Sequence, residues 1–243
     1  MAFDPDTTVG DLVAARPSRS RVLDRYGIDY CCGGQRTLEE AARESGVAVE
    51  ELTTALADAD AGTSDDEPDL RTLSLAALIR DITGRHHAFL REELPRLTEL
   101  TAMVHRAHGE NHPELAEVET LFADLRAELE NHLEKEEQVL FPMIESMEAS
   151  RNVEPSHCGS VRNPIGVMED EHDGAAAALS RLRALTGDFT PPADGCNAYR
   201  ALMAGLVELE HDLHRHIHKE NSVLFPRATA LEAELIRAEE AGA

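Results

Sequence analysis

The sequence predicts an all-α protein, in which a small N-terminal helical domain precedes an antiparallel four-helix bundle. No convincing run of period-two alternation occurs, so strands are not expected. Four long helical patterns with modest connections follow one another in the second part of the chain, which favours a bundle. Between the two parts lies the acidic, apolar-poor stretch DADAGTSDDEPD. The expected organisation is a domain over residues 1–57, a linker over 58–69 and a bundle over 70–243.

Short helices are expected in the N-terminal domain. Thr8 precedes an apolar helical pattern, and a second pattern continues to Ile28. Thr37 and Glu40 have the spacing of a capping box, which predicts a helix that stops near Gly46. A last short helix follows before the linker.

Each of the four bundle helices is predicted from its own apolar stripe. Their expected ranges are about 72–107, 113–147, 164–185 and 197–238. Gly84 and Pro95 are expected to bend the first of them.

Composition excludes several classes of partner. Asp and Glu number 47 against 23 Lys and Arg, which gives a formal net charge of −24. A chain this acidic should repel nucleic acid and anionic membrane surfaces. No apolar run long enough to span a membrane and no signal peptide is recognised, so a cytoplasmic protein is expected.

An internal repeat contains most of the candidate metal-binding residues. Residues 132–142 (HLEKEEQVLFP) and 216–226 (HIHKENSVLFP) share seven of eleven residues. Each copy has a His followed four residues later by a Glu, so that both side chains lie on one face of a helix, one turn apart. The pairs are His132 with Glu136 and His216 with Glu220.

The repeat places these side chains on the apolar stripe that should face the core. A buried carboxylate costs several kcal/mol unless it is compensated, and a bound cation would compensate for it. A lone His also precedes each pair, by 45 residues in the first half and by 44 in the second. The candidate ligands are therefore His87, His132, Glu136, His172, His216 and Glu220.

Four imidazoles and two carboxylates suit iron or manganese better than the closed tetrahedral sites of zinc or the all-oxygen shell of calcium. We infer a dinuclear iron centre in the middle of the bundle, with duplication of an inert bundle as the alternative. His86 and His87 differ by about 100° of rotation on their helix, and spacing leaves either as the ligand. Lys135 and Lys219 are expected to point to solvent, and His218 is left out of the ligand set.

Several segments in combination resemble one family over nearly all of the chain. The bundle resembles hemerythrin-like domains, and the whole chain is similar to the RIC (repair of iron centres) family. Matching that family's R-E-x-L-P segment places the first-helix ligand on His87, with His86 where relatives often have an aromatic residue. The segments are YGIDYCCGG (26–34), TLEEAARESG (37–46), HHAFLREELPRL (86–97), HPEL (112–115), HLEKEEQVLFP, MEDEHD (168–173) and HIHKENSVLFP.

The resemblance implies two non-haem iron ions bridged by Glu136, Glu220 and an oxo or hydroxo group. It also implies repair of iron–sulfur clusters damaged by nitrosative or oxidative stress, by iron donation or by removal of nitric oxide. The alternatives are a hemerythrin-like module that senses or binds oxygen, nitric oxide or iron, and an enzyme that reduces nitric oxide or consumes peroxide. Damaged iron–sulfur proteins are the expected partners, nitric oxide or oxygen the small ligands, and the chain is expected to be a monomer or homodimer.

Adjacent cysteines, Cys31 and Cys32, sit between Tyr30 and two glycines. A disulfide between neighbours would be strained and reducible, and the glycines allow a tight turn that exposes the thiols. Two small buried hydrophobes are the alternative. Within the family signature we expect the pair to handle electrons or iron, whereas Cys158 and Cys196 lie outside it.

Overall fold

The computed structural model describes residues 3–62, 68–154 and 156–242 of the chain. Helices make up nearly all of its regular structure, and no strand occurs within those ranges, in agreement with the predicted all-α class. By contacts the chain divides into two compact units, one formed by residues 81–143 and 162–213, the other by 1–80, 144–161 and 214–243. No helix in the described part of the chain is long and apolar enough to cross a membrane.

Two of the N-terminal helices begin at a threonine side chain that caps the helix. The N-terminal helices are α1 (Val9–Ala15), α2 (Ser20–Arg25), α3 (Leu38–Glu44) and α4 (Val49–Gly62), with the 3-10 turn η1 (Pro17–Arg19) between the first two. The side chain of Thr8 accepts from the backbone N–H of Asp11 at the start of α1. At α3 both hydrogen bonds of the predicted capping box between Thr37 and Glu40 are present.

One helix ends earlier than its apolar pattern suggests. The second helix was expected to reach Ile28, but α2 stops at Arg25. Gly27 adopts a positive φ of 63°, and the N–H of Ile28 bonds back to the carbonyl of Leu23 at 2.9 Å. This is the left-handed C-terminal turn that glycine favours, and it returns Ile28 to the core without continuing the helix.

Twelve buried residues form the core of the N-terminal helices, so this part has an apolar centre of its own. They are Val9, Leu12, Val13, Val22, Leu23, Ile28, Tyr30, Leu38, Ala41, Ala42, Leu52 and Leu56. Helix α4 continues to Gly62, five residues into the range expected as a linker, and residues 63–67 lie outside the described part. The domain boundaries of the sequence analysis stay a prediction.

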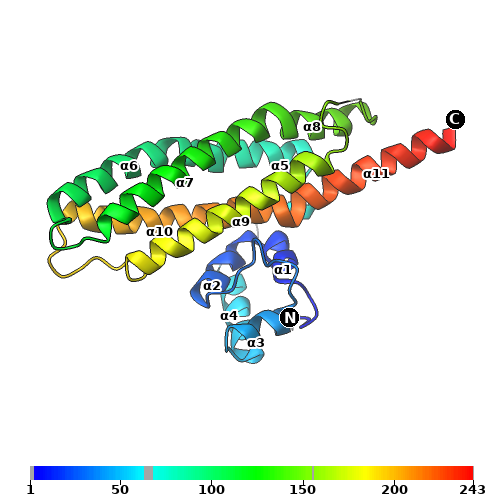
Figure 1. Cartoon of the computed structure of the whole chain (residues 1–243). Helices are drawn as coiled ribbons and strands as arrows, with labels where there is room; N and C mark the ends of the chain where they lie inside the picture. Colours follow the sequence, from blue (N-terminus) through cyan, green and yellow to red (C-terminus); the bar gives the residue numbers. More distant parts are fainter. Residues whose placement is uncertain (1–2, 63–67, 155, 243) are drawn as a thin grey trace. The chain divides into compact units, whose positions relative to one another are not determined.

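The unit formed by residues 81–143 and 162–213 contains the four-helix bundle (Figure 1). The bundle helices are α6 (Ala88–His108), α7 (Leu115–Lys135), α9 (Arg162–Leu185) and α10 (Asn197–His218). Pro95 lies inside α6 without ending it. Helix α7 packs against both α6 and α9.

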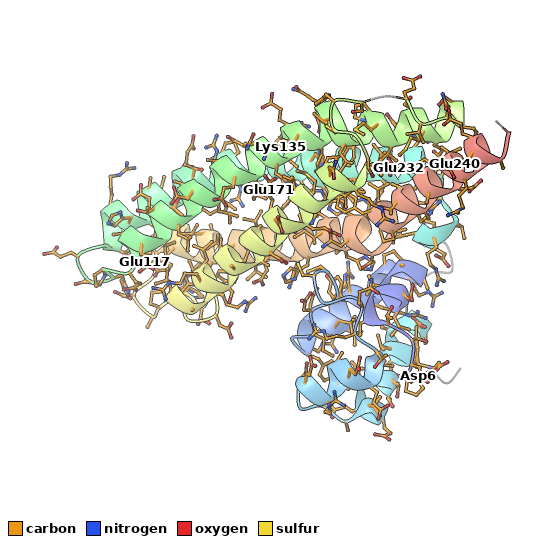
Figure 2. The ribbon with its side chains drawn as sticks, turned by 45° about the vertical axis from the view of Figure 1, so that its right-hand side comes forward. Asp6, Glu117, Lys135, Glu171, Glu232 and Glu240 are labelled. Atoms are coloured by element: carbon orange, nitrogen blue, oxygen red, sulfur yellow. The ribbon has the colours of Figure 1, made fainter. Side chains whose placement is uncertain are left out.

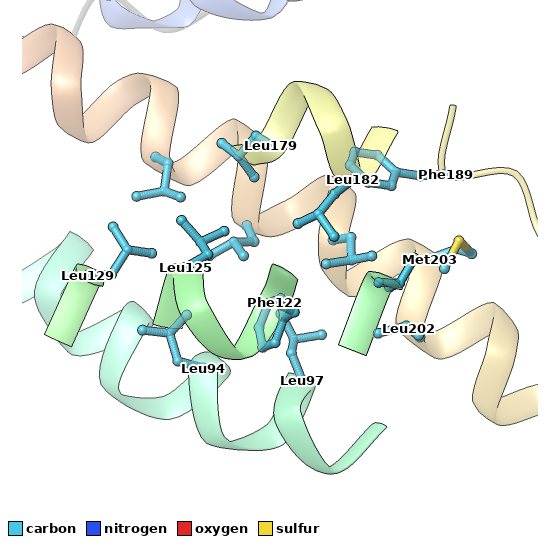
Figure 3. Close-up of a cluster of buried hydrophobic side chains, with 14 of the residues drawn as sticks. Leu94, Leu97, Phe122, Leu125, Leu129, Leu179, Leu182, Phe189, Leu202 and Met203 are labelled. Carbon is cyan, nitrogen blue, oxygen red and sulfur yellow. The ribbon is translucent and has the colours of Figure 1, made fainter. Parts of the chain in front are cut away.

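Leucine and phenylalanine side chains from all four helices fill one end of the bundle (Figure 3). Phe122 of α7, for example, is fully buried among leucines of its neighbours. Each such side chain stabilises the fold by about 1.5–3 kcal/mol through removal of apolar surface from water. This part of the bundle core is therefore apolar and does not depend on any ionisable group.

Three of the long predicted helices are interrupted by a wider π-helical turn. These turns are η3 (Ile82–His87), η4 (Glu136–Leu140) and η5 (Lys219–Leu224), and each contains one predicted ligand. A π-turn inserts an extra residue into the helix, which rotates the following side chains and often marks a functional site. Gly84, the predicted bend, lies in the first of these turns.

The other unit includes further segments beyond the N-terminal helices, namely the 3-10 turn η2 (Leu70–Thr72), α5 (Leu75–Asp81), α8 (Phe141–Ser150) and α11 (Phe225–Gly242). Glutamate carboxylates join some of these segments by accepting hydrogen bonds from backbone N–H groups near the starts of helices. Glu148 accepts from the backbone N–H groups of Leu75 and Ala76 at 2.8 and 2.9 Å, which caps α5. Glu232 accepts from the N–H of Val161 at 2.8 Å.

Candidate metal centre

Four of the predicted ligands gather in the bundle unit. His87 and Glu136 are completely buried, and His132 and His172 are each 3% exposed. Nε2 of His87 lies 3.3 Å and Nε2 of His132 lies 3.5 Å from Oε2 of Glu136. Nε2 of His172 lies 3.2 Å from Nε2 of His132. Nε2 atoms of two imidazoles thus face one carboxylate, and Nε2 of a third imidazole lies beside one of them.

The second copy of the repeat has the same local geometry. Nε2 of His216 lies 3.0 Å from Oε1 of Glu220, and both side chains are essentially buried. Helix α10 supplies His216, and the π-turn η5 supplies Glu220. The i, i+4 spacing therefore places the pair on one helix face, as the sequence predicts.

The six predicted ligands form two groups, in each of which the possible ligand atoms lie within 4.8 Å of one another. One group is His87, Glu136, His216 and Glu220; the other is His132, Glu136, His172 and Glu220. The two carboxylates belong to both groups, so they are placed to be shared by two ions. The donor set of two imidazoles and two shared carboxylates for each ion fits a first-row transition metal. Ligation itself stays a prediction.

His86, the alternative to His87, has a different role in the structure. Its Nδ1 lies 2.9 Å from Oδ1 of Asp212 on α10, and both side chains are buried. His86 belongs to neither ligand group. The geometry favours His87 as the ligand, which is the choice that the family resemblance implied.

Behind His87 the structure places a carboxylate that sequence reasoning did not name. Nδ1 of His87 lies 2.7 Å from Oε1 of Glu137, and Nη2 of Arg91 lies 2.7 Å from Oε2 of the same side chain. Burial acts to raise the pKa of Glu137, but the hydrogen bonds and charges of Arg91 and His87 outweigh it, so this pKa lies below its ordinary value. A carboxylate with a lowered pKa is ionised at neutral pH and can accept a hydrogen bond from an Nδ1–H group.

A second carboxylate lies behind His132 in the same way. Nδ1 of His132 lies 2.9 Å from Oε2 of Glu171 on α9, whose other oxygen binds the ammonium of Lys135. Figure 2 shows Lys135 on α7 and Glu171 on α9 at neighbouring positions. Burial opposes ionisation of Glu171, yet Lys135 and His132 outweigh it and the pKa of Glu171 is lowered.

The expectation that both lysines point to solvent is wrong for one of them. Lys135 is partly exposed and paired with Glu171, whereas Lys219 is only 6% exposed. Lys219 opens the π-turn η5, against which α1 packs. Its burial follows from this packing, which the helical pattern of the sequence does not contain.

His218 is also buried against the N-terminal helices. Its Nε2 donates to the carbonyl oxygen of Gly10 at 2.8 Å, and its ring meets that of Tyr30 edge-on at 5.6 Å. Burial is the main reason that the pKa of His218 is lowered to about 4; the charge of Lys219 adds to this, and the bond to Gly10 opposes it. His218 is therefore a neutral structural donor, consistent with its omission from the ligand set.

The cysteine pair lies on a loop that Asp29 organises. Its Oδ1 accepts from the N–H groups of Cys31 and Cys32 at 3.0 and 3.1 Å, and its Oδ2 accepts from the N–H of Gly33 at 2.8 Å. Both thiols are free and 4.0 Å apart, with Cys31 buried and Cys32 half-buried. The expected exposure therefore holds only for Cys32.

The chemistry of the two thiols differs as a result. The hydrogen bond with Cys32, burial and the charge of Asp29 all raise the pKa of Cys31. Cys31 is thus a protonated thiol and a weak nucleophile at neutral pH. A reaction with a solvent-borne molecule would begin at Cys32.

Comparison with known proteins agrees with this architecture. Residues 78–228 match the family model described as hemerythrin HHE cation binding domain, and residues 5–60 match a domain of unknown function (DUF542). By fold and by the ligand cluster the protein is a hemerythrin-like helical protein with an additional N-terminal domain.

Full-length relatives specify the family further. The iron-sulfur cluster repair protein YtfE of Enterobacter sp. (strain 638) is 39% identical over 230 residues, which cover 95% of this chain and 99% of the relative. YtfE proteins of Edwardsiella ictaluri and of Escherichia coli O157:H7 are each 37% identical, over 92% and 93% of this chain and 96% and 97% of the relatives. The chain belongs to the YtfE family of iron-sulfur cluster repair proteins, as the resemblance to RIC proteins predicted.

Proposed function

We propose that this protein repairs iron–sulfur clusters damaged by nitrosative or oxidative stress and that its bundle holds two iron ions. The observation that supports this most directly is the pair of ligand groups that share Glu136 and Glu220. Relatives that match nearly the whole chain carry the name iron-sulfur cluster repair protein.

The side chains present define what the site would do. His87 and His216 would bind one ion, His132 and His172 the other, and the two glutamates would bridge them. Iron held by these groups would supply a redox-active centre that binds nitric oxide, or a labile store from which iron is donated. Burial of all six side chains excludes bulk water from the ligands.

We infer a supporting role for the cysteine loop. Cys32 is the more accessible thiol and Cys31 lies beside it, so the pair is suited to pass electrons or iron. Because the loop is built by Asp29, its shape does not depend on either thiol.

The test begins with iron content and an anaerobic spectrum. About two iron ions per chain are expected for the parent and clearly fewer for Glu136→Ala or Glu220→Ala. Recovery of a nitric-oxide-damaged cluster enzyme is then measured with the parent and with Cys31→Ala and Cys32→Ala. A protein that binds oxygen or nitric oxide reversibly but restores no cluster would instead be the sensing module, and catalytic gas turnover would mark an enzyme. A colourless protein without iron would overturn the proposal.

A further inference from the structure

Two carboxylates outside the ligand set lie directly behind two of the ligand imidazoles. Nδ1 of His87 is 2.7 Å from Glu137, and Nδ1 of His132 is 2.9 Å from Glu171. The opposite ring nitrogen, Nε2, lies 3.3 Å from Glu136 in His87 and 3.5 Å in His132. Each ring therefore has one nitrogen bound to an outer carboxylate and the other directed toward the ligand cluster.

A cation near the surface of the bundle fixes each outer carboxylate. Arg91 binds the second oxygen of Glu137, and Lys135 binds the second oxygen of Glu171. Both glutamate side chains are 30% exposed, so each reaches from the protein surface to a fully or almost fully buried imidazole. With both oxygens engaged, the carboxylate has little freedom to turn away from the ring.

The internal repeat does not reproduce these two carboxylates. In the second copy of the repeat Asn221 stands where the first has Glu137. Likewise Glu171 precedes His172 in the second half of the repeat, whereas the equivalent residue before His87 in the first half is His86. The outer carboxylates therefore arise at two unrelated positions of the repeat.

The two imidazoles that they bind nevertheless belong to different ligand groups. His87 belongs to the group with His216, and His132 belongs to the group with His172. Each candidate ion position thus contains one imidazole that is bound to an outer carboxylate.

We propose that Glu137 and Glu171 are positioning residues, one for each ion position, which hold His87 and His132 with Nδ1 protonated and Nε2 free for metal before any metal binds. The part of this inference that concerns iron rests on the proposed function. A neutral imidazole has two tautomers, and an ionised carboxylate at Nδ1 accepts only from the tautomer that leaves the lone pair on Nε2. The same hydrogen bond makes Nε2 a stronger donor to the metal.

The metal-free protein gives the first test. Long-range ¹H–¹⁵N spectra of the imidazoles report which nitrogen carries the proton in each ring. We expect the Nδ1–H form of both rings in the parent, and a smaller share of this form in His87 for Glu137→Gln and in His132 for Glu171→Gln. A neutral amide oxygen is a weaker acceptor than a carboxylate, and the amide N–H can donate to Nδ1 of the other tautomer. This measurement needs no iron, so its result does not depend on the proposed function.

Anaerobic titration of the full chain with Fe(II) against a competing chelator gives the second test. Each single variant should lower the affinity for iron at one of the two positions by roughly 10–100-fold and leave the other position at parental affinity. The double variant should lower the affinity at both positions. Matched controls are Glu134→Gln on α7 and Glu169→Gln on α9, since both side chains are exposed and, within the described part of the chain, neither is hydrogen-bonded to a ligand imidazole. Both controls should behave as the parent.

Two results would overturn the inference. The first is parental tautomers together with parental affinity for both ions in Glu137→Gln and Glu171→Gln. The second is equal weakening of both ions in each single variant, because a general loss of stability has that effect and a position-specific contact does not. A chain that shows the expected shifts yet restores no damaged cluster would refute the proposed function alone.

Discussion

Replacement of Glu136 by Gln separates the role of this residue in metal binding from its cost to the fold. Glu136 is completely buried, and its contacts include the imidazoles of His87 and His132. An ionised carboxylate in such a place loses several kcal/mol of hydration. We expect the metal-free Glu136→Gln protein to be more stable than the parent by about 1–3 kcal/mol, a rise in Tm of roughly 2–12 °C for a chain of this size.

With iron the order should reverse. Because Glu136 belongs to both ligand groups, its replacement should weaken iron binding at both proposed positions. Iron at 1,000 times its Kd stabilises the parent by about 4 kcal/mol, and the variant should lose most of this gain. The measurement is thermal unfolding under anaerobic conditions, with chelator and with Fe(II).

Glu134→Gln is the matched control, since Glu134 is an exposed carboxylate two residues earlier on the same helix. It should leave both transitions within about 0.5 kcal/mol of the parent. The reasoning is refuted if metal-free Glu136→Gln is less stable than the parent, or if iron stabilises it as much as it does the parent.

Two further predictions concern the rest of the chain. A Cβ on Gly10 would lie 2.8 Å from Oγ of Ser222 and 2.9 Å from the carbonyl oxygen of Gly34, so Gly10→Ala should destabilise the protein by about 1–3 kcal/mol in denaturant unfolding. A Cβ on Gly174 in α9 would meet nothing within 4 Å, so Gly174→Ala should stabilise the protein by about 0.5–1 kcal/mol. Equal effects of the two substitutions would contradict the close contact at Gly10. The pKa of Asp60 is lowered because the hydrogen bonds and charges of its arginine partners, chiefly Arg19, outweigh the opposing effect of burial. Its stabilising effect is therefore present above its unfolded pKa of about 3.8 and is lost as pH falls through the lower folded value. Asp60→Asn should thus be less stable than the parent at pH 7, and the difference should close in acid unfolding as Asp60 becomes protonated; a difference that persists after Asp60 is protonated would contradict the assignment.

Local periodicity made the helices and the ligand pairs predictable. The capping box at Thr37 and the i, i+4 pairs of the repeat depend only on residues one turn apart, and helix geometry brings such residues together whatever surrounds them. The end of α2 was missed because Gly27 adopts the left-handed conformation after an apolar pattern that otherwise continues. The π-turns were also missed, since a single inserted residue leaves little trace in an apolar stripe.

Local sequence patterns did not predict the contacts between distant segments. Glu171 meets His132 across 39 residues of sequence, and His218 meets Gly10 across 208. Lys219 is buried in a turn against which α1 packs. No periodic signal marks these residues, because their partners are chosen by packing between helices.

The sequence by itself determined that this chain forms helices and that six His and Glu side chains lie on the buried faces of four of them. A repeat with fixed spacing specifies both properties, because both depend only on the position of a residue within its own helix. Only the tertiary structure decided which carboxylates stand behind which imidazoles, which lysine is buried and which thiol is accessible. Those features depend on the distances between helices. In a close-packed core these distances are set jointly by many side chains, so no single helix determines them.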